Sequence, residues 1–199
     1  MRTSVPKPRE TRHLAVEFAN TGRNEGGRSN FWAWSQLVHY LQSNSIVSPE
    51  RAEELLDLPK ADSSSANALL QRAKELCIAI REAFYARVHN KRLSRESVNT
   101  INRVLRITEG HDELVLRDES WRLEFVAAES GSDWLLAAIA RSAAEILSEP
   151  PPGGLRLCLN PNCGLFFYDA SPTHRRRWCS MAVCGNRQKV AAFARRRAK

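Results

Sequence analysis

The sequence lacks any long hydrophobic run. No apolar stretch approaches the roughly 18 to 20 residues with which a helix crosses a bilayer, and the first residues, MRTSVPKPRETRH, lack the apolar core of a secretion signal. A hydrophobic content of 43% with 26% charged residues is typical of a globular protein that folds in water. We therefore expect no membrane partner and a location in the reducing cytoplasm, where disulfides are disfavoured.

Acidic residues are absent from the last thirty positions. Nine Lys and Arg residues follow Asp169 without any Asp or Glu, which leaves 21 basic against 22 acidic residues for positions 1–169. The net charge of +8 is therefore concentrated at the C-terminus. Such a segment attracts polyanions, because Lys and Arg neutralise phosphates and release their counterions. A solvated tail that only aids solubility is the alternative.

Four of the five cysteines occur as two short-spaced pairs. Cys158 and Cys163 form the first pair, Cys179 and Cys184 form the second, and 15 residues separate the pairs. This pattern predicts one structural Zn²⁺ ion held by all four sulfurs. Unrelated buried thiols are the alternative, and a redox dithiol fits poorly because its cysteines are usually two residues apart. Cys77, within a predicted helix, is most simply a small core residue.

The residues around the four cysteines predict a knuckle, a hairpin and a helix. Residues 160–162, Asn-Pro-Asn, are a strong turn signal, and Gly164 permits the positive φ often needed beside a knuckle cysteine. LFFYD (165–169) alternates like a strand, ASPTHRRR follows as a hairpin turn, and the return strand is expected to end at Trp178 and Cys179. Ser180 is a good N-cap for a C-terminal helix that carries Cys184 in its first turn. This order is that of a treble-clef zinc finger.

Two sides of the C-terminal helix differ when successive residues are placed 100° apart. We expect one side to face the zinc and the hairpin, and it holds Val183, Cys184, Arg187, Val190, Ala191 and Ala194. Arg187 is expected to bond carbonyls or thiolates there, and Trp178 to support the metal site with it.

The other side of this helix is a basic stripe around one aromatic. It suits contact with duplex DNA and contains Asn186, Lys189, Phe193, Arg196 and Arg197. Arg175, Arg176 and Arg177 are further candidates for phosphate contacts. Alternatively, Phe193 packs on the larger domain and the arginines are only solvated.

The residues before the cysteine pairs are predicted to be mainly helical. Apolar periodicity and capping residues predict helices near 30–43, from Ser48, from 63 to about 88, from Ser94 and over 132–148. ELVLRDESWRLEFV shows period two around a turn at 117–120, which predicts a β-hairpin. The fold class is therefore predicted as α+β, with a mainly helical N-terminal domain, a small antiparallel hairpin and a C-terminal treble-clef zinc finger.

No catalytic constellation stands out in the sequence. The histidines of the larger part are dispersed without metal-ligand spacing: His13, His39, His89 and His111. In the finger, His174 has no carboxylate after Asp169 with which to form a nuclease site. We therefore predict that the protein is not an enzyme. The alternative, a small-molecule enzyme in residues 11–149, lacks a nameable nucleophile or acid–base pair.

Residues 158–197 resemble the CGNR-type zinc finger. The resemblance rests on FFYDAS, RRRWCSMAVCGNR and RQKVAAFARRR, and the family takes its name from residues like those at 184–187 here. It implies a zinc-dependent DNA-binding finger whose ligands are Cys158, Cys163, Cys179 and Cys184.

The preceding residues are similar to an ABATE domain, which lies before the finger in that family. The motifs are LAVEFANT, FWAWSQLVHYLQSNSIVS, AIREAFYARV and VNTINRVL, with a glycine-rich insert, GRNEGGRS, after the first. The resemblance implies a ligand-sensing or regulatory module of stress-responsive bacterial transcription regulators. Polar residues within the motifs are candidates either for a small-ligand pocket or for helix caps: Asn20, Thr21, Arg81 and Asn102.

These features predict a disordered tail at 1–10, an ABATE-like domain at 11–149, a linker at 150–154 and a zinc finger at 155–199. The predicted function is control of transcription by a cytoplasmic bacterial protein that binds duplex DNA at the nucleoid, while its N-terminal domain senses an unidentified small ligand or a partner. A finger that binds RNA or another protein is the alternative. Because a single finger has a small footprint, a homodimer is also considered.

Overall fold

The computed structural model describes residues 14–21, 33–106, 110–117, 120–127, 133–148 and 154–197. The predicted disordered tail, the glycine-rich insert and residues 150–153 of the predicted linker lie outside these ranges. In the part of the chain that the structure describes, no helix combines the length and the apolar character of a membrane span.

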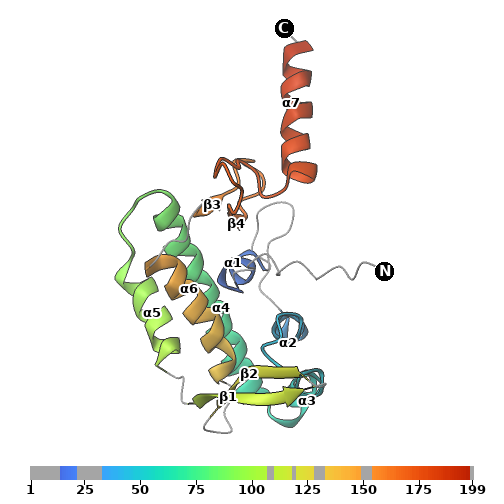
Figure 1. The fold of residues 1–199 in the computed structure, drawn as a ribbon, viewed down its shortest axis with the longest axis vertical. Coiled ribbons are helices and arrows are strands. Elements are labelled where there is room, and N and C mark those ends of the chain that lie inside the picture. The colour runs from blue at the N-terminus through green and yellow to red at the C-terminus, as the bar shows by residue number, and fades with distance from the viewer. Residues whose placement is uncertain are drawn as a thin grey trace.

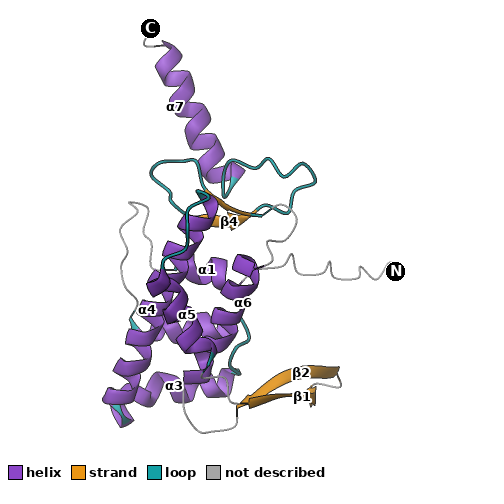
Figure 2. Ribbon diagram, turned by 90° about the vertical axis from the view of Figure 1, so that its left-hand side faces the viewer, coloured by secondary structure: helices purple, strands orange, loops and turns teal. Residues whose placement is uncertain are grey.

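The N-terminal part is built mainly from helices (Figures 1 and 2). They are α1 (Leu14–Asn20), α2 (Trp34–Ser43), α3 (Pro49–Ala61), α4 (Ser63–Val88), α5 (Arg95–Leu105), a short 3-10 helix η1 (Asp133–Leu136) and α6 (Ala137–Ser148). The predicted N-caps are present, because the side chains of Ser48 and Ser94 accept hydrogen bonds from backbone amides of α3 and α5. The cap of α4 is Asp62, whose carboxylate accepts from the Ser65 amide.

The long helix α4 is the centre of this part, with α5 and α6 packed along it (Figure 1). Its predicted buried face is confirmed: Leu69, Leu76, Ile80 and Phe84 are each at most 1% exposed. Cys77 is buried on the same helix, and burial raises the pKa of its thiol to about 11. The thiol therefore stays protonated, as expected of a core residue.

The predicted hairpin of the helical part is present. Strands β1 (Gly110–Arg117) and β2 (Ser120–Ala127) pair in antiparallel register, with Leu114 opposite Leu123 and Arg117 opposite Ser120. The pair of Arg117 and Ser120 closes the ladder at the predicted turn.

The C-terminal part begins with a second, smaller sheet and ends in a projecting helix (Figure 1). Strand β3 (Leu155–Leu157) pairs antiparallel with β4 (Phe166–Tyr168), and the two join across the Cys158–Cys163 turn. A π-helical turn, η2 (Met181–Gly185), then leads into α7 (Asn186–Arg197).

The predicted pairing of this small sheet is wrong. Residues 165–169 were expected to pair with a return strand ending at Trp178 and Cys179, whereas β4 pairs with β3, which precedes the first cysteine. Residues 174–177 form no strand, although the Leu159 amide donates to the Arg177 carbonyl at 3.0 Å. The Asp169 carboxylate accepts hydrogen bonds from the Ser171 and Arg176 amides. These side-chain bonds take the place of the backbone hydrogen bonds that a return strand would make.

The small sheet packs into the core of the helical part. Phe166 of β4 is 2% exposed, and its ring meets the edge of the Phe84 ring with centroids 5.7 Å apart. The Arg81 guanidinium lies over the same Phe166 ring, 5.3 Å from its centroid. Leu155 and Leu157 of β3 pack against this core as well. The metal-binding part and the helical part therefore share one hydrophobic core.

Asn20, at the end of α1, joins the two parts through both atoms of its amide. Its Nδ2 donates to the Phe166 carbonyl at 2.7 Å, and its Oδ1 accepts from the Phe166 amide at 2.8 Å. A side-chain amide thus occupies the place that a neighbouring strand would take beside β4. We call this pair of hydrogen bonds the Asn20 clamp.

Substitution Asn20→Ala is expected to lower the free energy of unfolding by about 1–3 kcal/mol, because it leaves the Phe166 amide and carbonyl without their partners. Asn99→Ala is the matched control, since Asn99 is exposed on α5, and it should change the value by at most about 0.5 kcal/mol. Urea unfolding followed by circular dichroism provides both values. Equal stability of the two variants would contradict the role of the clamp.

Candidate metal centre

The Sγ atoms of Cys158, Cys163, Cys179 and Cys184 all lie within 4.8 Å of one another. Cys179 Sγ is 3.7 Å from both Cys163 Sγ and Cys184 Sγ. Four sulfurs about 2.3 Å from a central Zn²⁺ in tetrahedral geometry would be separated by about 3.8 Å. The predicted four-cysteine set therefore has the spacing of a closed structural site for one zinc ion.

The first two ligands lie on the turn between β3 and β4. The Cys158 amide donates to the Leu165 carbonyl and the Cys163 amide donates to the Asn160 carbonyl, each at 2.9 Å. Gly164 has φ +60°, the left-handed conformation expected beside a knuckle cysteine. These bonds bend the turn so that both sulfurs point to the same side.

Asn160 and Gln188 connect the knuckle to the C-terminal helix. Asn160 is 4% exposed, and its Nδ2 lies 3.4 Å from Cys184 Sγ. Its Oδ1 accepts from the Asn162 amide and from Gln188 Nε2, both at 3.2 Å. The turn was predicted from Asn160, but its contact with a ligand sulfur was not. No sequence pattern indicated Gln188, because only the fold brings it to the knuckle.

The surroundings of the cysteines raise the pKa of two thiols and lower the pKa of a third. Burial raises the pKa of Cys163 and of Cys179, and for Cys179 hydrogen bonds with the neighbouring thiols raise it further. Burial also opposes ionisation of Cys184, but hydrogen bonds from Asn160 and the other thiols outweigh it and lower its pKa. Four thiolates this close repel one another, and the charge of a bound Zn²⁺ offsets that repulsion.

The turn η2 fixes how the last ligand enters the site. Ser180 caps it as predicted, because its Oγ accepts from the Val183 amide at 3.3 Å. Gly185 follows the ligand Cys184, and a Cβ there would lie 2.4 Å from Met181 Sδ and 3.2 Å from Trp178 Cδ1. Trp178 packs against the cysteine cluster. Glycine therefore leaves room for Met181 and for the Trp178 ring beside the cysteine cluster.

Asp169 organises the loop between β4 and Cys179, a role that the sequence analysis missed. Its carboxylate is fully buried and lies 3.1 Å from Arg156 Nε. Burial opposes ionisation, but hydrogen bonds from the Ser171 side chain and the Arg176 and Ser171 amides, with the charge of Arg156, lower its pKa overall. The Asp-x-Ser spacing at 169–171 favours such local hydrogen bonds and could have indicated this role from the sequence.

The helix α7 leaves the body of the protein (Figure 1), and of the side predicted to face the zinc only Cys184 does so. Val183 is 48% exposed and Val190 is 68% exposed, and Arg187, Ala191 and Ala194 are exposed as well. Beside this ligand, Gly185 and Gln188 bring the helix to the knuckle. The prediction was wrong because the apolar residues were assumed to be covered, whereas the helix extends beyond the small sheet.

The residues predicted to contact DNA are all exposed. They are Arg175, Arg176, Arg177, Asn186, Lys189, Phe193, Arg196 and Arg197. Phe193 is 54% exposed beneath the Arg197 guanidinium, 5.2 Å from its ring centroid, so it does not pack on the larger domain. Arg176 and Arg177 lie over the rings of Phe167 and Trp178. The metal centre thus carries an exposed basic surface.

The four residues proposed for a ligand pocket lie near the junction of the two parts or on α5. Asn20 and Arg81 contact Phe166, and the Thr21 hydroxyl donates to the Phe18 carbonyl at 2.5 Å. Asn102 lies half-buried on α5. The structure therefore gives Asn20 and Arg81 a role in joining the parts.

Zinc content tests the four-cysteine site. The purified protein is expected to hold one zinc per chain, and Cys184→Ser should lose it because a closed site needs all four sulfurs. Cys77→Ala should keep one zinc, since Cys77 lies in the helical core. Elemental analysis checks both variants. Zinc retained by Cys184→Ser, or lost by Cys77→Ala, would contradict the assignment.

A bulky residue at position 185 tests the packing of η2. Gly185→Leu is expected to displace Met181 and Trp178, to lower the free energy of unfolding by roughly 1–3 kcal/mol and to speed zinc transfer to a chelator. Ala182→Leu adds similar bulk at an exposed position of the same turn and should leave both quantities unchanged. Indistinguishable behaviour of the two variants would show that Gly185 has no packing role.

Two family descriptions match the chain. One, "Putative stress-induced transcription regulator" (ABATE), matches residues 12–150, and the other, "CGNR zinc finger", matches residues 155–197. No curated protein matches the chain. The order of the two matches is the predicted one, and the second contains all four clustered cysteines. Because the first match spans well over half of the sequence, the chain belongs to the ABATE family, which that description names, and ends in a CGNR zinc finger.

Proposed function

We propose that this protein regulates transcription by binding duplex DNA through its C-terminal part. The observation that carries the proposal is the exposed, acid-free basic surface that the cysteine cluster holds in place. After Asp169 the chain has nine Lys and Arg residues and no acid. Lys and Arg at such a surface neutralise DNA phosphates and release counterions, which provides affinity for DNA.

The helical part is proposed to sense a small ligand and to transmit its binding to the finger. The shared core and the Asn20 clamp support this role, because a shift of α1 or α4 would move β4 with it. A cleft of about 390 Å³ is also lined by both parts, including Arg87 of α4 and Arg156 of β3. Arg156 is paired with Asp169, but the guanidinium groups of Arg87 and Arg177 at this cleft would suit an anionic ligand.

The protein is not proposed to be an enzyme, and neither matched description names a catalytic activity. A regulator of this kind would act in the cytoplasm at the nucleoid. Since one finger covers few base pairs, we propose that it acts as a homodimer on DNA. An RNA- or protein-binding finger is the competing proposal, and a stronger affinity for single-stranded RNA than for duplex DNA would favour it.

Binding to duplex DNA across a salt series tests the proposal. We expect the slope of log K against log salt to correspond to roughly four to six neutralised phosphates, at about 0.9 per phosphate. Cys184→Ser should lose most of the affinity for DNA, because without the zinc site the basic helix is no longer held in a fixed position. Cys77→Ala should retain the affinity. No affinity for duplex DNA, or affinity without salt dependence, would refute the proposal.

A further inference from the structure

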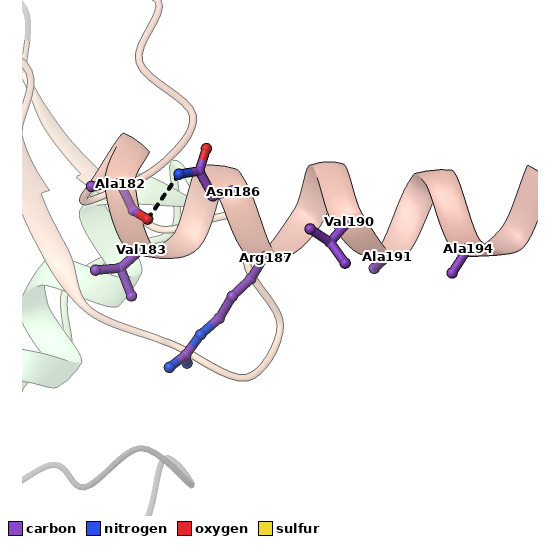
Figure 3. A pocket seen from close by; sticks show the side chains of 7 residues that line it. All are labelled: Ala182, Val183, Asn186, Arg187, Val190, Ala191 and Ala194. Carbon is purple, nitrogen blue, oxygen red and sulfur yellow. Dashed lines mark hydrogen bonds between the residues drawn. The ribbon is translucent and has the colours of Figure 1, made fainter.

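One side of α7 forms a shallow apolar hollow, whose lining side chains Figure 3 shows. The body side is identified by Gln188, which bonds Asn160, and by Ala192, since both are half-buried. The hollow lies on the outward side and is lined by Ala182, Val183, Asn186, Arg187, Val190, Ala191 and Ala194. We call these seven residues the Val190 face.

The Val190 face combines small apolar side chains with two polar ones. Alanines and valines form its floor, so that another surface can approach the helix closely. Arg187 reaches away from the helix axis toward the finger end of α7, and Asn186 turns back so that its Nδ2 donates to the Ala182 carbonyl at 3.1 Å (Figure 3). Arginine pairs with the guanine edge and asparagine with the adenine edge, while alanine and valine methyl groups suit the thymine methyl group.

The charge of α7 favours duplex DNA over a second copy of the same helix as the partner of this face. Residues 186–197 contain five Lys and Arg residues and no acid, so a second copy of α7 laid on the first would be repelled. Duplex DNA has the complementary charge, and its major groove, about 12 Å wide, admits an α-helix. The 12 residues of α7 extend about 18 Å from the finger, enough to span that width.

We propose that the Val190 face is the base-contacting surface of α7, with Arg187 and Asn186 as its specificity-determining residues. This assignment rests on the DNA-binding function proposed above and differs from the sequence-based one. Lys189 and Arg196 lie toward the flank of the helix, about 100° or more from Val190 around the axis. They contact phosphates on the groove wall, and so contribute affinity without sequence preference.

Selection of bound sequences from a pool of randomised duplexes tests the assignment, with the zinc-loaded full-length protein. The wild-type protein should enrich a motif. Arg187→Ala and Asn186→Ala should each lose preference at one or two base pairs, with discrimination falling by about 5- to 150-fold. Lys189→Ala and Arg196→Ala are the matched controls: the motif should persist, while affinity falls for every sequence and the salt slope decreases by about one.

A pair of charge substitutions supplies an independent measurement. Lys189→Glu changes the net charge of α7 by −2 and Val190→Glu changes it by −1, so a purely electrostatic surface predicts the larger loss of affinity for Lys189→Glu. The Val190 face predicts the reverse order for the selected motif, because a carboxylate at its centre is brought against the base edges. Zinc content and circular dichroism of each variant should match the wild type.

Three results would overturn the assignment while leaving DNA binding intact. They are a wild-type protein without sequence preference, a motif unchanged by Arg187→Ala and Asn186→Ala, and a larger loss for Lys189→Glu than for Val190→Glu. Self-association without DNA that Val190→Glu abolishes would reassign the face to a dimer contact. No affinity of the wild-type protein for any duplex would instead refute the proposed function, and this assignment with it.

Discussion

The convergence of four cysteine sulfurs is the constraint on which the C-terminal part depends. Most apolar residues of this segment are not buried, and its own buried cluster consists of Cys158, Phe167 and Cys184. Sulfurs within 4.8 Å of one another therefore hold together the knuckle, the loop after β4 and the start of α7. Asn160 extends this constraint into the helix, because it bonds both Cys184 and Gln188. Without the cluster, the basic helix would have no fixed direction.

The second constraint is the insertion of β4 into the helical core. Phe166 is buried against Phe84 and Arg81, and Asn20 holds its backbone. Two stretches matched by different family descriptions are therefore physically continuous at this strand. The regulation proposed above needs such a connection, since an event in the helical part could affect the proposed DNA binding only if the two parts move together.

Much of the fold was predictable because its signals are local. Helix periodicity, the N-caps Ser48, Ser94 and Ser180, and the period-two hairpin depend on nearby residues, and the cysteine spacing was enough to predict the zinc site. The errors concern long-range contacts. The pairing of β4 with β3 and the role of Asn20 beside Phe166 depend on segments brought together only by the tertiary fold. The exposed apolar side of α7 was misjudged because hydrophobicity alone does not say whether a neighbour is present to cover it.

The C-terminal part depends most directly on one zinc ion held by four thiolates. X-ray absorption at the zinc edge of the full-length protein measures the number, the type and the distance of the ligands. The account predicts four sulfur ligands at about 2.3 Å and no nitrogen or oxygen ligand. A site with fewer than four sulfurs, or with mixed nitrogen and oxygen coordination, would contradict it.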